Sequence, residues 1–302
     1  MKVKAIVPAT AANLGPGFDC FGLALGLYNE VTVEFTGRPG FSVSFSGEGS
    51  SFLPHDQRNL IYRGLVEVFE WLGEPHPGFR ISALNRIPVS RGLGSSAAAI
   101  VAGIVAADRF LGQRLSAPNK LALAAGIEGH PDNVAPALFG GLVLTYSVPD
   151  ETRWEQLFIG PGLVPVVCIP DLYVPTAKAR AVLPGSVSYT SAVHNLARSA
   201  LLVHALSSGR YELLGEAMAD ALHQPFRARL VPGFVEAKSA ALEAGAFGAS
   251  LSGSGSTILA LTSPEKAEVV GRAMVAVFRH RGTEARALAL PVVTEGARTE
   301  VL

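Results

Sequence analysis

Four small residues that suit phosphate binding stand together in the run PVSRGLGSSAAAI: Gly92, Gly94, Ser95 and Ser96. Glycine permits positive φ angles and a close approach of ligand to backbone, and the alanines that follow favour a helix. A helix N-terminus has unsatisfied N–H groups and a partial positive charge, which suit an anion, most often phosphate. The two hydroxyls could bond phosphate oxygens or Mg²⁺. The same residues would also suit a plain helix start packed closely on a sheet.

The two most familiar phosphate-binding loops do not fit this run. No GxxxxGK[ST] pattern occurs in the chain, so it is not a Walker A loop. GLGSSA does match G-x-G-x-x-A, but a dinucleotide fold also needs a strand directly before it and an acidic residue about 20 positions later. Here NRIPVSR separates strand from loop, and no acidic residue closes a strand near 112–118.

Polar residues also gather in three other loops. Asn13 and Asp19 lie in PATAANLGPGFDCFGLAL, where an Asp carboxylate could face a substrate amine, although Asn and Asp also suit ordinary turns. The run EGHPDNVAPALFGG places Glu, His, Asp and Asn within six residues. No further His or Cys has metal-ligand spacing, so this run favours a binding site over a metal centre. A second glycine-rich loop, SLSGSGST, covers 250–257 and could equally be a simple turn.

Composition limits the classes of protein that the chain can belong to. Its 302 residues are 49% hydrophobic and 17% charged, which fits one large or two ordinary domains and excludes a disordered chain. The net charge of zero disfavours a nucleic-acid partner. Cys20 and Cys168 lie far apart in the sequence, and we expect both to be reduced thiols. No signal-peptide pattern opens the chain, and the apolar run 97–107 is too short to span a membrane. We therefore expect a cytoplasmic protein with no membrane partner.

Apolar patterning predicts the elements that must hold these loops. Strands are expected at 2–9, 29–36, 41–47, 79–84, 142–148, 163–170 and 285–293, and directly after the second glycine-rich loop. Helices are expected at 59–72, 95–111, 116–130, 188–207, 210–223 and 263–281. The class is α+β with two domains, divided in the polar segment 150–162. Early consecutive strands lack helical crossovers, which favours antiparallel sheets.

The three small-residue loops, PATAANLGPGFD, PVSRGLGSSAA and SGSGS, resemble in their order the motifs of the GHMP kinase superfamily. NLIYR, EGHPDNVAPALFGG and HQPFRARLVPGF extend the resemblance over nearly the whole chain and are similar to the homoserine kinase family. It implies a transferase that moves the γ-phosphate of ATP to the hydroxyl of L-homoserine, on the threonine pathway. It also implies a homodimer. Alternatives are another GHMP-type kinase, acting on mevalonate or a sugar, and a nucleotide-binding regulator without turnover.

The resemblance also implies the architecture. The N-terminal ATP-binding domain, 1–158, would be similar to domain 2 of ribosomal protein S5. The C-terminal GHMP kinase domain, 159–302, would be ferredoxin-like, with the site between the two domains.

For the nucleotide, the resemblance places Asn59 near adenine and Ser96 and Glu128 near Mg²⁺. The ATP loop would comprise Pro88, Val89, Ser90, Arg91, Gly92, Leu93, Gly94, Ser95, Ser96, Ala97 and Ala98. Arg91 or Lys178 would help to neutralise the transferred phosphoryl oxygens. We expect Gly94→Val to abolish ATP binding while the chain stays folded.

For the amino acid, the resemblance implies that Asn13 and Asp19 meet the amine and hydroxyl end. A second wall would be formed by His130, Asp132 and Asn133. Arg180 and Arg227 would bind the carboxylate, since a guanidinium fits that planar anion, although Arg229 could replace Arg227.

The catalytic residues would be Asp19, Asp132 and Asn133. The resemblance favours catalysis without a strong base; if a base operates, Asp19 or Asp132 is the candidate. At Ser256 the family usually has proline, and we expect only a small local change there.

Overall fold

Long apolar and alternating runs at the start of the chain form the centre of the first sheet. The computed structural model describes residues 1–149 and 151–302. Strand β1 (Lys2–Ala12) pairs antiparallel with β2 (Phe21–Thr36), with a register shift at Pro8/Ala9. The sheet has the order β11-β1-β2-β4-β3, and β5 and β6 continue from β2. Its other strands are β3 (Phe41–Gly47), β4 (Gly78–Asn85), β5 (Leu142–Val148), β6 (Glu151–Leu157) and β11 (Arg298–Val301).

One pairing in this sheet differs from the antiparallel arrangement that the sequence predicts. Strands β3 and β4 run parallel. The helix α1 (Leu60–Leu72) lies between them in the chain and brings the chain back to the end of the sheet at which β3 began. A helical crossover of this kind is what parallel neighbours require.

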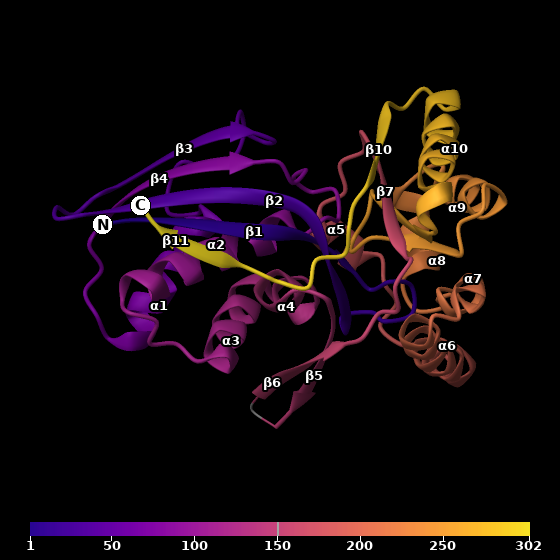
Figure 1. The fold of residues 1–302 in the computed structure, drawn as a ribbon, viewed down its shortest axis with the longest axis horizontal. Coiled ribbons are helices and arrows are strands. Elements are labelled where there is room, and N and C mark those ends of the chain that lie inside the picture. Colours follow the sequence, from indigo (N-terminus) through magenta and orange to yellow (C-terminus); the bar gives the residue numbers. More distant parts are fainter. Residues whose placement is uncertain (150) are drawn as a thin grey trace.

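Helices α1, α2 (Ser95–Phe110), α3 (Ala117–Glu128) and α4 (Pro131–Phe139) cover one face of the first sheet (Figure 1). Helix α2 is buried along most of its length and packs against α1, α3, α4 and β1. Its many alanines explain this central place, because a helix of small side chains can approach neighbours on several sides. The sheet and these helices therefore hold the start of α2 in a fixed position.

The second sheet is antiparallel, with the order β10-β7-β9-β8. Its strands are β7 (Val164–Pro170), β8 (Gly248–Leu251), β9 (Ile258–Thr262) and β10 (Ala285–Ala289). The accompanying helices are α5 (Thr176–Ala181), α6 (Tyr189–Ser208), α7 (Leu214–Ala217), α8 (Gln224–Arg227), α9 (Phe234–Glu243) and α10 (Ala267–His280). Two sheets with helices grouped beside them confirm the predicted two-domain α+β class.

The segment 210–223 is not the single helix that the sequence predicts. It forms a short 3₁₀ turn, Tyr211–Leu213, then α7, and then a turn into α8. Asp220 explains the break, because its carboxylate accepts the backbone N–H groups of Leu222, His223 and Gln224. A side chain that caps the next helix in this way competes with continuation of the previous one.

No single boundary in the chain separates the strands of the first sheet from those of the second. Within the predicted boundary segment 150–162, residues 151–157 form β6, paired with β5, and Asp150 lies outside the described residues. At the other end, β11 pairs with β1 in the first sheet, so residues 298–301 do not join the C-terminal sheet. The division into 1–158 and 159–302 stays a prediction, and β11 crosses it.

A single apolar core joins the two halves. Leu259 and Leu261 of the second sheet belong to the same buried cluster as Val31 and Leu65 of the first half. A smaller cluster lies between the second sheet and the helices α9 and α10. Among the described residues, no helix is long and apolar enough to cross a membrane.

Candidate active site

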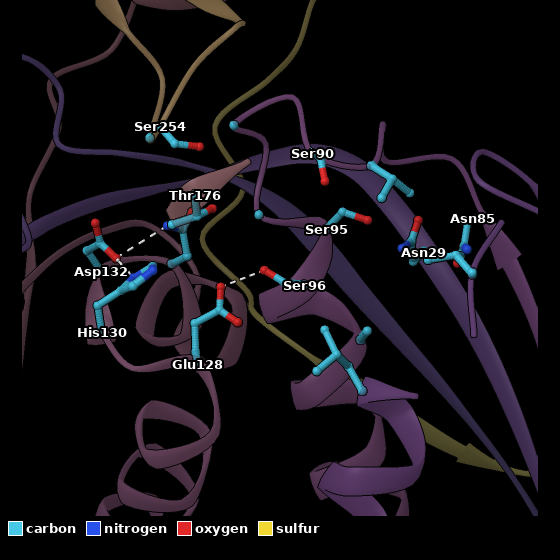
Figure 2. Close-up of a pocket in the computed structure, with 18 of the residues that line it drawn as sticks. Asn29, Asn85, Ser90, Ser95, Ser96, Glu128, His130, Asp132, Thr176 and Ser254 are labelled. Atoms are coloured by element: carbon cyan, nitrogen blue, oxygen red, sulfur yellow. Dashed lines mark hydrogen bonds and ion pairs between the residues drawn. The ribbon is translucent and has the colours of Figure 1, made fainter. Parts of the chain in front are cut away.

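A cavity of about 380 Å³ lies where loops of both halves meet the N-terminal end of α2 (Figure 2). Loops around Asn13, Asn59, Ser95, His130 and Arg180 all contribute side chains to it. In Figure 2, Asn29 and Asn85 lie at one end and His130 and Asp132 at the other, with Ser95 and Ser96 between them. The cavity therefore has two ends joined at the start of a buried helix.

The glycines of the central loop are required by both its backbone and its packing. Gly92 and Gly94 have φ angles of 77° and 69°, in the left-handed region. A Cβ on Gly92 would lie 2.1 Å from the Ser252 carbonyl oxygen, and one on Gly94 would lie 1.9 Å from Thr10 Oγ1. Ser252 Oγ also donates to the Gly92 carbonyl at 2.6 Å. The second glycine-rich loop thus braces the first, and only glycine fits between them.

This loop opens α2 without a side-chain cap. Gly94 is the N-cap residue and accepts the Ala98 N–H. The first N–H groups of a helix have no partner inside it, and Ser95 and Ser96 carry two of them at the cavity wall. An anion placed there would receive backbone hydrogen bonds and the favourable end of the helix dipole. The residues present therefore fit a phosphate chain.

Ser96 and Glu128 point toward one another across the cavity (Figure 2). Ser96 Oγ donates to Glu128 Oε1 at 2.5 Å. Burial raises the pKa of the Glu128 carboxyl, and the Ser96 hydrogen bond offsets only part of that rise. A hydroxyl and a carboxylate suit Mg²⁺, which binds proteins through one or two carboxylates and takes its other oxygens from phosphates and water. The described residues contain no cluster of three or more His, Cys, Asp or Glu side chains that could hold a metal by itself.

His130, Asp132, Asn133 and Thr10 form a connected polar wall. His130 Nδ1 donates to Asp132 Oδ1 at 2.5 Å, and Asn133 Nδ2 donates to the same oxygen at 3.3 Å. Thr10 Oγ1 donates to Asn133 Oδ1 at 2.7 Å. Burial disfavours the charged imidazolium of His130, but the Asp132 carboxylate outweighs it, so the pKa of His130 is raised.

Asp19 and Arg180 form a bidentate ion pair beside this wall. The guanidinium nitrogens donate to the two carboxylate oxygens at 2.9 and 3.0 Å. Asn13 fixes the Asp19 loop, because its Oδ1 accepts the Asp19 N–H at 3.1 Å and its Nδ2 donates to the Gly253 carbonyl at 3.0 Å. Asn13 and Asp19 both have positive φ angles, which Asn and Asp tolerate better than most residues.

Arg227 is buried at the same end of the cavity. Its Nε donates to the Ala179 carbonyl and its Nη1 to the Gly253 carbonyl, both at 3.1 Å. Within the part of the chain that the structure describes, no carboxylate lies within ion-pair distance of it. Burial lowers the pKa of this guanidinium, and the nearby Arg180 lowers it further. A buried cation without an anionic partner is costly, so this position is suited to an anionic group of a ligand.

Comparison with known proteins agrees with this geometry. Residues 59–141 match the family described as GHMP kinases N terminal domain, and residues 202–280 match GHMP kinases C terminal. The homoserine kinase of Desulfitobacterium hafniense is 46% identical over 295 residues, which cover 98% of this chain and 99% of that protein. That of Gloeobacter violaceus is 47% identical, with 90% of this chain and 91% of the relative covered. The chain belongs to the homoserine kinase family of GHMP kinases.

Solved structures extend the comparison. The crystal structure of homoserine kinase from Cytophaga hutchinsonii has a TM-score of 0.91 at 33% identity, with 99% of this chain and 97% of that chain covered. The L. major mevalonate kinase in complex with R-mevalonate has a TM-score of 0.73 at 18% identity, with 96% of each chain covered. At that identity, the second likeness concerns the fold alone.

The structure brings most residues singled out by the homoserine kinase resemblance to the cavity. Those that line it are Asn13, Asp19, Asn59, Val89, Ser90, Gly92, Gly94, Ser95, Ser96, Glu128, His130, Asp132, Asn133, Arg180 and Arg227. Arg229, the alternative to Arg227, is exposed and donates to the Val182 carbonyl.

Part of the predicted ATP loop does not reach the cavity. Leu93, Ala97 and Ala98 are fully buried in the core beneath it. Pro88 and Arg91 line a neighbouring pocket, where Arg91 donates to Asp171 Oδ1 at 2.7 Å. Lys178 is exposed and is not among the lining residues. The predicted contact of Arg91 or Lys178 with the phosphates is therefore not supported.

Asn59 lines the cavity, but its side chain has a structural task. Its Oδ1 accepts the N–H groups of Ile61 and Tyr62 as the N-cap of α1, and its Nδ2 donates to the Pro54 carbonyl at 2.9 Å. It therefore shapes the cavity by holding the 54–58 loop, whose Pro54 and Arg58 also line it.

Several lining residues were not singled out as site residues from the sequence. They are Asn29, Phe45, Leu53, Pro54, Arg58, Leu60, Ile61, Asn85, Ala99, Thr176, Gly253 and Ser254. Thr176 opens α5, one turn before Arg180, so the helical spacing from that arginine could have indicated it. Gly253 and Ser254 belong to the predicted second glycine-rich loop. Phe45 and Leu53 carried no signal of their own.

Proposed function

We propose that this protein catalyses the ATP-dependent phosphorylation of the L-homoserine hydroxyl to O-phospho-L-homoserine, a step of threonine biosynthesis. One observation carries the proposal: the cavity joins a helix start whose N–H groups suit phosphate to an end that presents both a carboxylate and a buried arginine. An amino acid carries an amine and a carboxylate, and Asp19 and Arg227 are groups of the opposite charge. Mevalonate and sugars have no amine, so they offer Asp19 no cation beyond Arg180, with which it already pairs.

The chain's own residues supply positioning and charge. The N–H groups at the start of α2 would hold the phosphates, and the polar wall of His130, Asp132 and Asn133 would orient the substrate hydroxyl. Ser96 and Glu128 would hold Mg²⁺, which supplies charge neutralisation on the phosphate oxygens when bound. Asp19 is engaged by Arg180, and Asp132 accepts hydrogen bonds from two neighbours. These contacts support transfer by positioning, without a strong base.

A coupled ADP-release assay with L-homoserine, mevalonate and galactose tests this proposal. We expect ATP- and Mg²⁺-dependent release with L-homoserine and only background release with the other two. Release with mevalonate or galactose alone would favour the other GHMP-type kinases. ATP binding without release on any hydroxyl would favour a regulator.

Two matched arginines sharpen the test. Because Arg227 faces the cavity and Arg229 does not, Arg227→Gln is expected to raise the KM for L-homoserine about 100-fold, while Arg229→Gln leaves it nearly unchanged. Asp19→Asn is expected to raise the same KM more than it lowers kcat. An unchanged homoserine affinity with a collapsed kcat would instead make Asp19 a group of the chemical step. The cytoplasmic location and the homodimer stay predictions, the latter to be tested by light scattering.

A further inference from the structure

His223 is a fully buried histidine outside the cavity lining, and it contacts the loop that carries Asp19. Its Nε2 lies 2.8 Å from the Gly15 carbonyl oxygen. A carbonyl only accepts, so Nε2 carries the proton and donates it. Its Nδ1 is buried and finds no hydrogen-bond partner among the residues that the structure describes. Burying a polar atom without a partner costs folding free energy. We therefore look for the role of this ring in the contacts of its other atoms.

The ring of His223 also stacks on Phe18, the residue directly before Asp19. The ring centroids are 5.2 Å apart and the planes are inclined by 26°. The guanidinium carbons of Arg227 and Arg180 lie over the Phe18 ring at 5.1 and 5.8 Å from its centroid. Phe18 is thus held by His223 and both arginines of the amino-acid end, and a cation over an aromatic face is attracted to it.

His223 is connected to Arg227 through the backbone as well. The carbonyl of His223 accepts the N–H groups of Phe226 and Arg227, which begins the short helix α8. The same residue therefore contacts the loop of Asp19 with its side chain and starts the turn of Arg227 with its main chain. Asn195 and Ser199 of α6 add donors to the Pro16 carbonyl at 3.1 and 3.2 Å, next to Gly15.

Burial favours the neutral form of the His223 ring. Burial lowers the pKa of the imidazole; Arg227 lowers it too, while Asp220, at 3.5 Å from Nε2, and Asp19 act in the opposite direction. The Gly15 contact requires a proton on Nε2, which both the neutral Nε2–H tautomer and the charged imidazolium carry. The contact is therefore permanent near neutral pH rather than switched by it.

We propose that His223 is a positioning residue for the amino-acid end of the cavity: through the Gly15 carbonyl and the Phe18 ring it fixes where Asp19 and Arg227 stand. It is not among the residues that line the cavity, so it would act through those two groups. The inference rests on the proposed function, because it requires that Asp19 and Arg227 bind L-homoserine.

Steady-state kinetics of His223→Phe and His223→Gln test the inference. Phenylalanine keeps a ring against Phe18 but loses the donor, and glutamine can place an N–H near the position of Nε2. We expect His223→Phe to raise the KM for L-homoserine about tenfold, with kcat and the KM for ATP within about twofold, since one lost hydrogen bond corresponds to roughly that factor. His223→Gln is expected to recover most of the loss. The exposed His280, changed to Phe, is the matched control.

Several results would overturn the positioning role of His223, the proposed function, or both. A homoserine KM of His223→Phe within twofold of the wild-type value, or an equal rise in both KM values, would overturn the inference. If His223→Phe does not fold, Phe18→Leu takes its place, and an unchanged homoserine KM there overturns the inference as well. Wild-type enzyme that turns over another hydroxyl but not L-homoserine would reject the proposed function, and the inference with it. Normal wild-type turnover with unaffected variants rejects the inference alone.

Discussion

At the scale of single residues, Glu128 is a carboxyl group whose burial costs stability when it is ionised. The carboxyl is buried against Ser96 and its pKa is raised by that burial. A raised pKa in the folded state means that the folded protein prefers the protonated carboxyl. The contribution of this group to stability is therefore fully present below its unfolded pKa and is lost as pH rises through the folded value.

We expect Glu128→Gln to be more thermostable than wild type at pH 7–8, because burial disfavours the ionised carboxylate that the unfolded chain carries there. The gain should disappear near pH 4, where wild type carries a proton there too. The same change should lower kcat about 100-fold or more, since it removes a charge from the proposed Mg²⁺ site. Thermal denaturation against pH and the ADP-release assay check both effects.

A Glu128→Gln variant that is less stable than wild type at every pH would show that the ionised carboxylate holds the fold. Asp108→Asn is an informative comparison, because that buried aspartate has a lysine partner, Lys120, at 2.7 Å. Its loss should destabilise the protein near neutral pH.

The residues of the candidate site were predictable where a motif fixed their type and spacing. They were less predictable where the local turn decides which side chain points into the cavity. Asn13, Asp19, Ser96 and His130 all line the cavity as the motifs indicated. QPFRAR contains two arginines, and the sequence does not say which one turns inward. The one-turn helix α8 points Arg227 inward, while Arg229 falls in the following 3₁₀ turn.

At the scale of elements, the close packing of β1 against the start of α2 changes one expectation. Gly94→Val is not a clean test of ATP binding, because a Cβ there meets Thr10 Oγ1 at 1.9 Å and the φ angle of 69° is strained for any side chain. Gly94→Ala is already expected to lower the free energy of unfolding by about 1–3 kcal/mol.

A double-mutant cycle separates the clash from the strain. Thr10→Ala removes the clashing oxygen, so Gly94→Ala should cost less in that background than in wild type. Urea denaturation of the four proteins measures the coupling. Fully additive effects would mean that backbone strain alone accounts for the loss.

The N-cap of α1 gives a second test at this scale. Asn59→Ala is expected to lower the free energy of unfolding by about 1 kcal/mol, because the cap of Ile61 and Tyr62 is lost. Asn59→Asp keeps the accepting oxygen but not the donor to the Pro54 carbonyl, so it should stay folded and raise only the KM for ATP. If Asn59→Asp and Asn59→Ala lose equal stability, the contact with Pro54 matters more than the cap.

Helices with clear start and stop signals were predictable from the sequence. The helix predicted over 95–111 is found at Ser95–Phe110, and the one over 188–207 at Tyr189–Ser208. Local signals failed where long-range contacts decide. Asp220 ends the segment 210–223 by capping α8, and the polar residues of β6 form a strand because β5 offers them a partner edge.

At the scale of the whole molecule, the shared core predicts that the two halves unfold together. Because Leu259 and Leu261 pack in one cluster with Val31 and Leu65, one side of the second sheet shares its core with the first half. Calorimetry should show one transition, with an enthalpy of about 200 kcal/mol near 60 °C for a chain of this length. Two resolved transitions would mean that each half is stable by itself.

The pairing of β11 with β1 has a consequence for how the protein is made. Val301 lies beside Val3, and both chain ends meet at the same sheet (Figure 1). Domains tend to fold in the order in which they leave the ribosome, yet one edge of the first sheet stays open until residues 298–301 have emerged. Until then the edge of β1 is available to other nascent chains. Residues 298–301 thus protect an edge that is translated long before them.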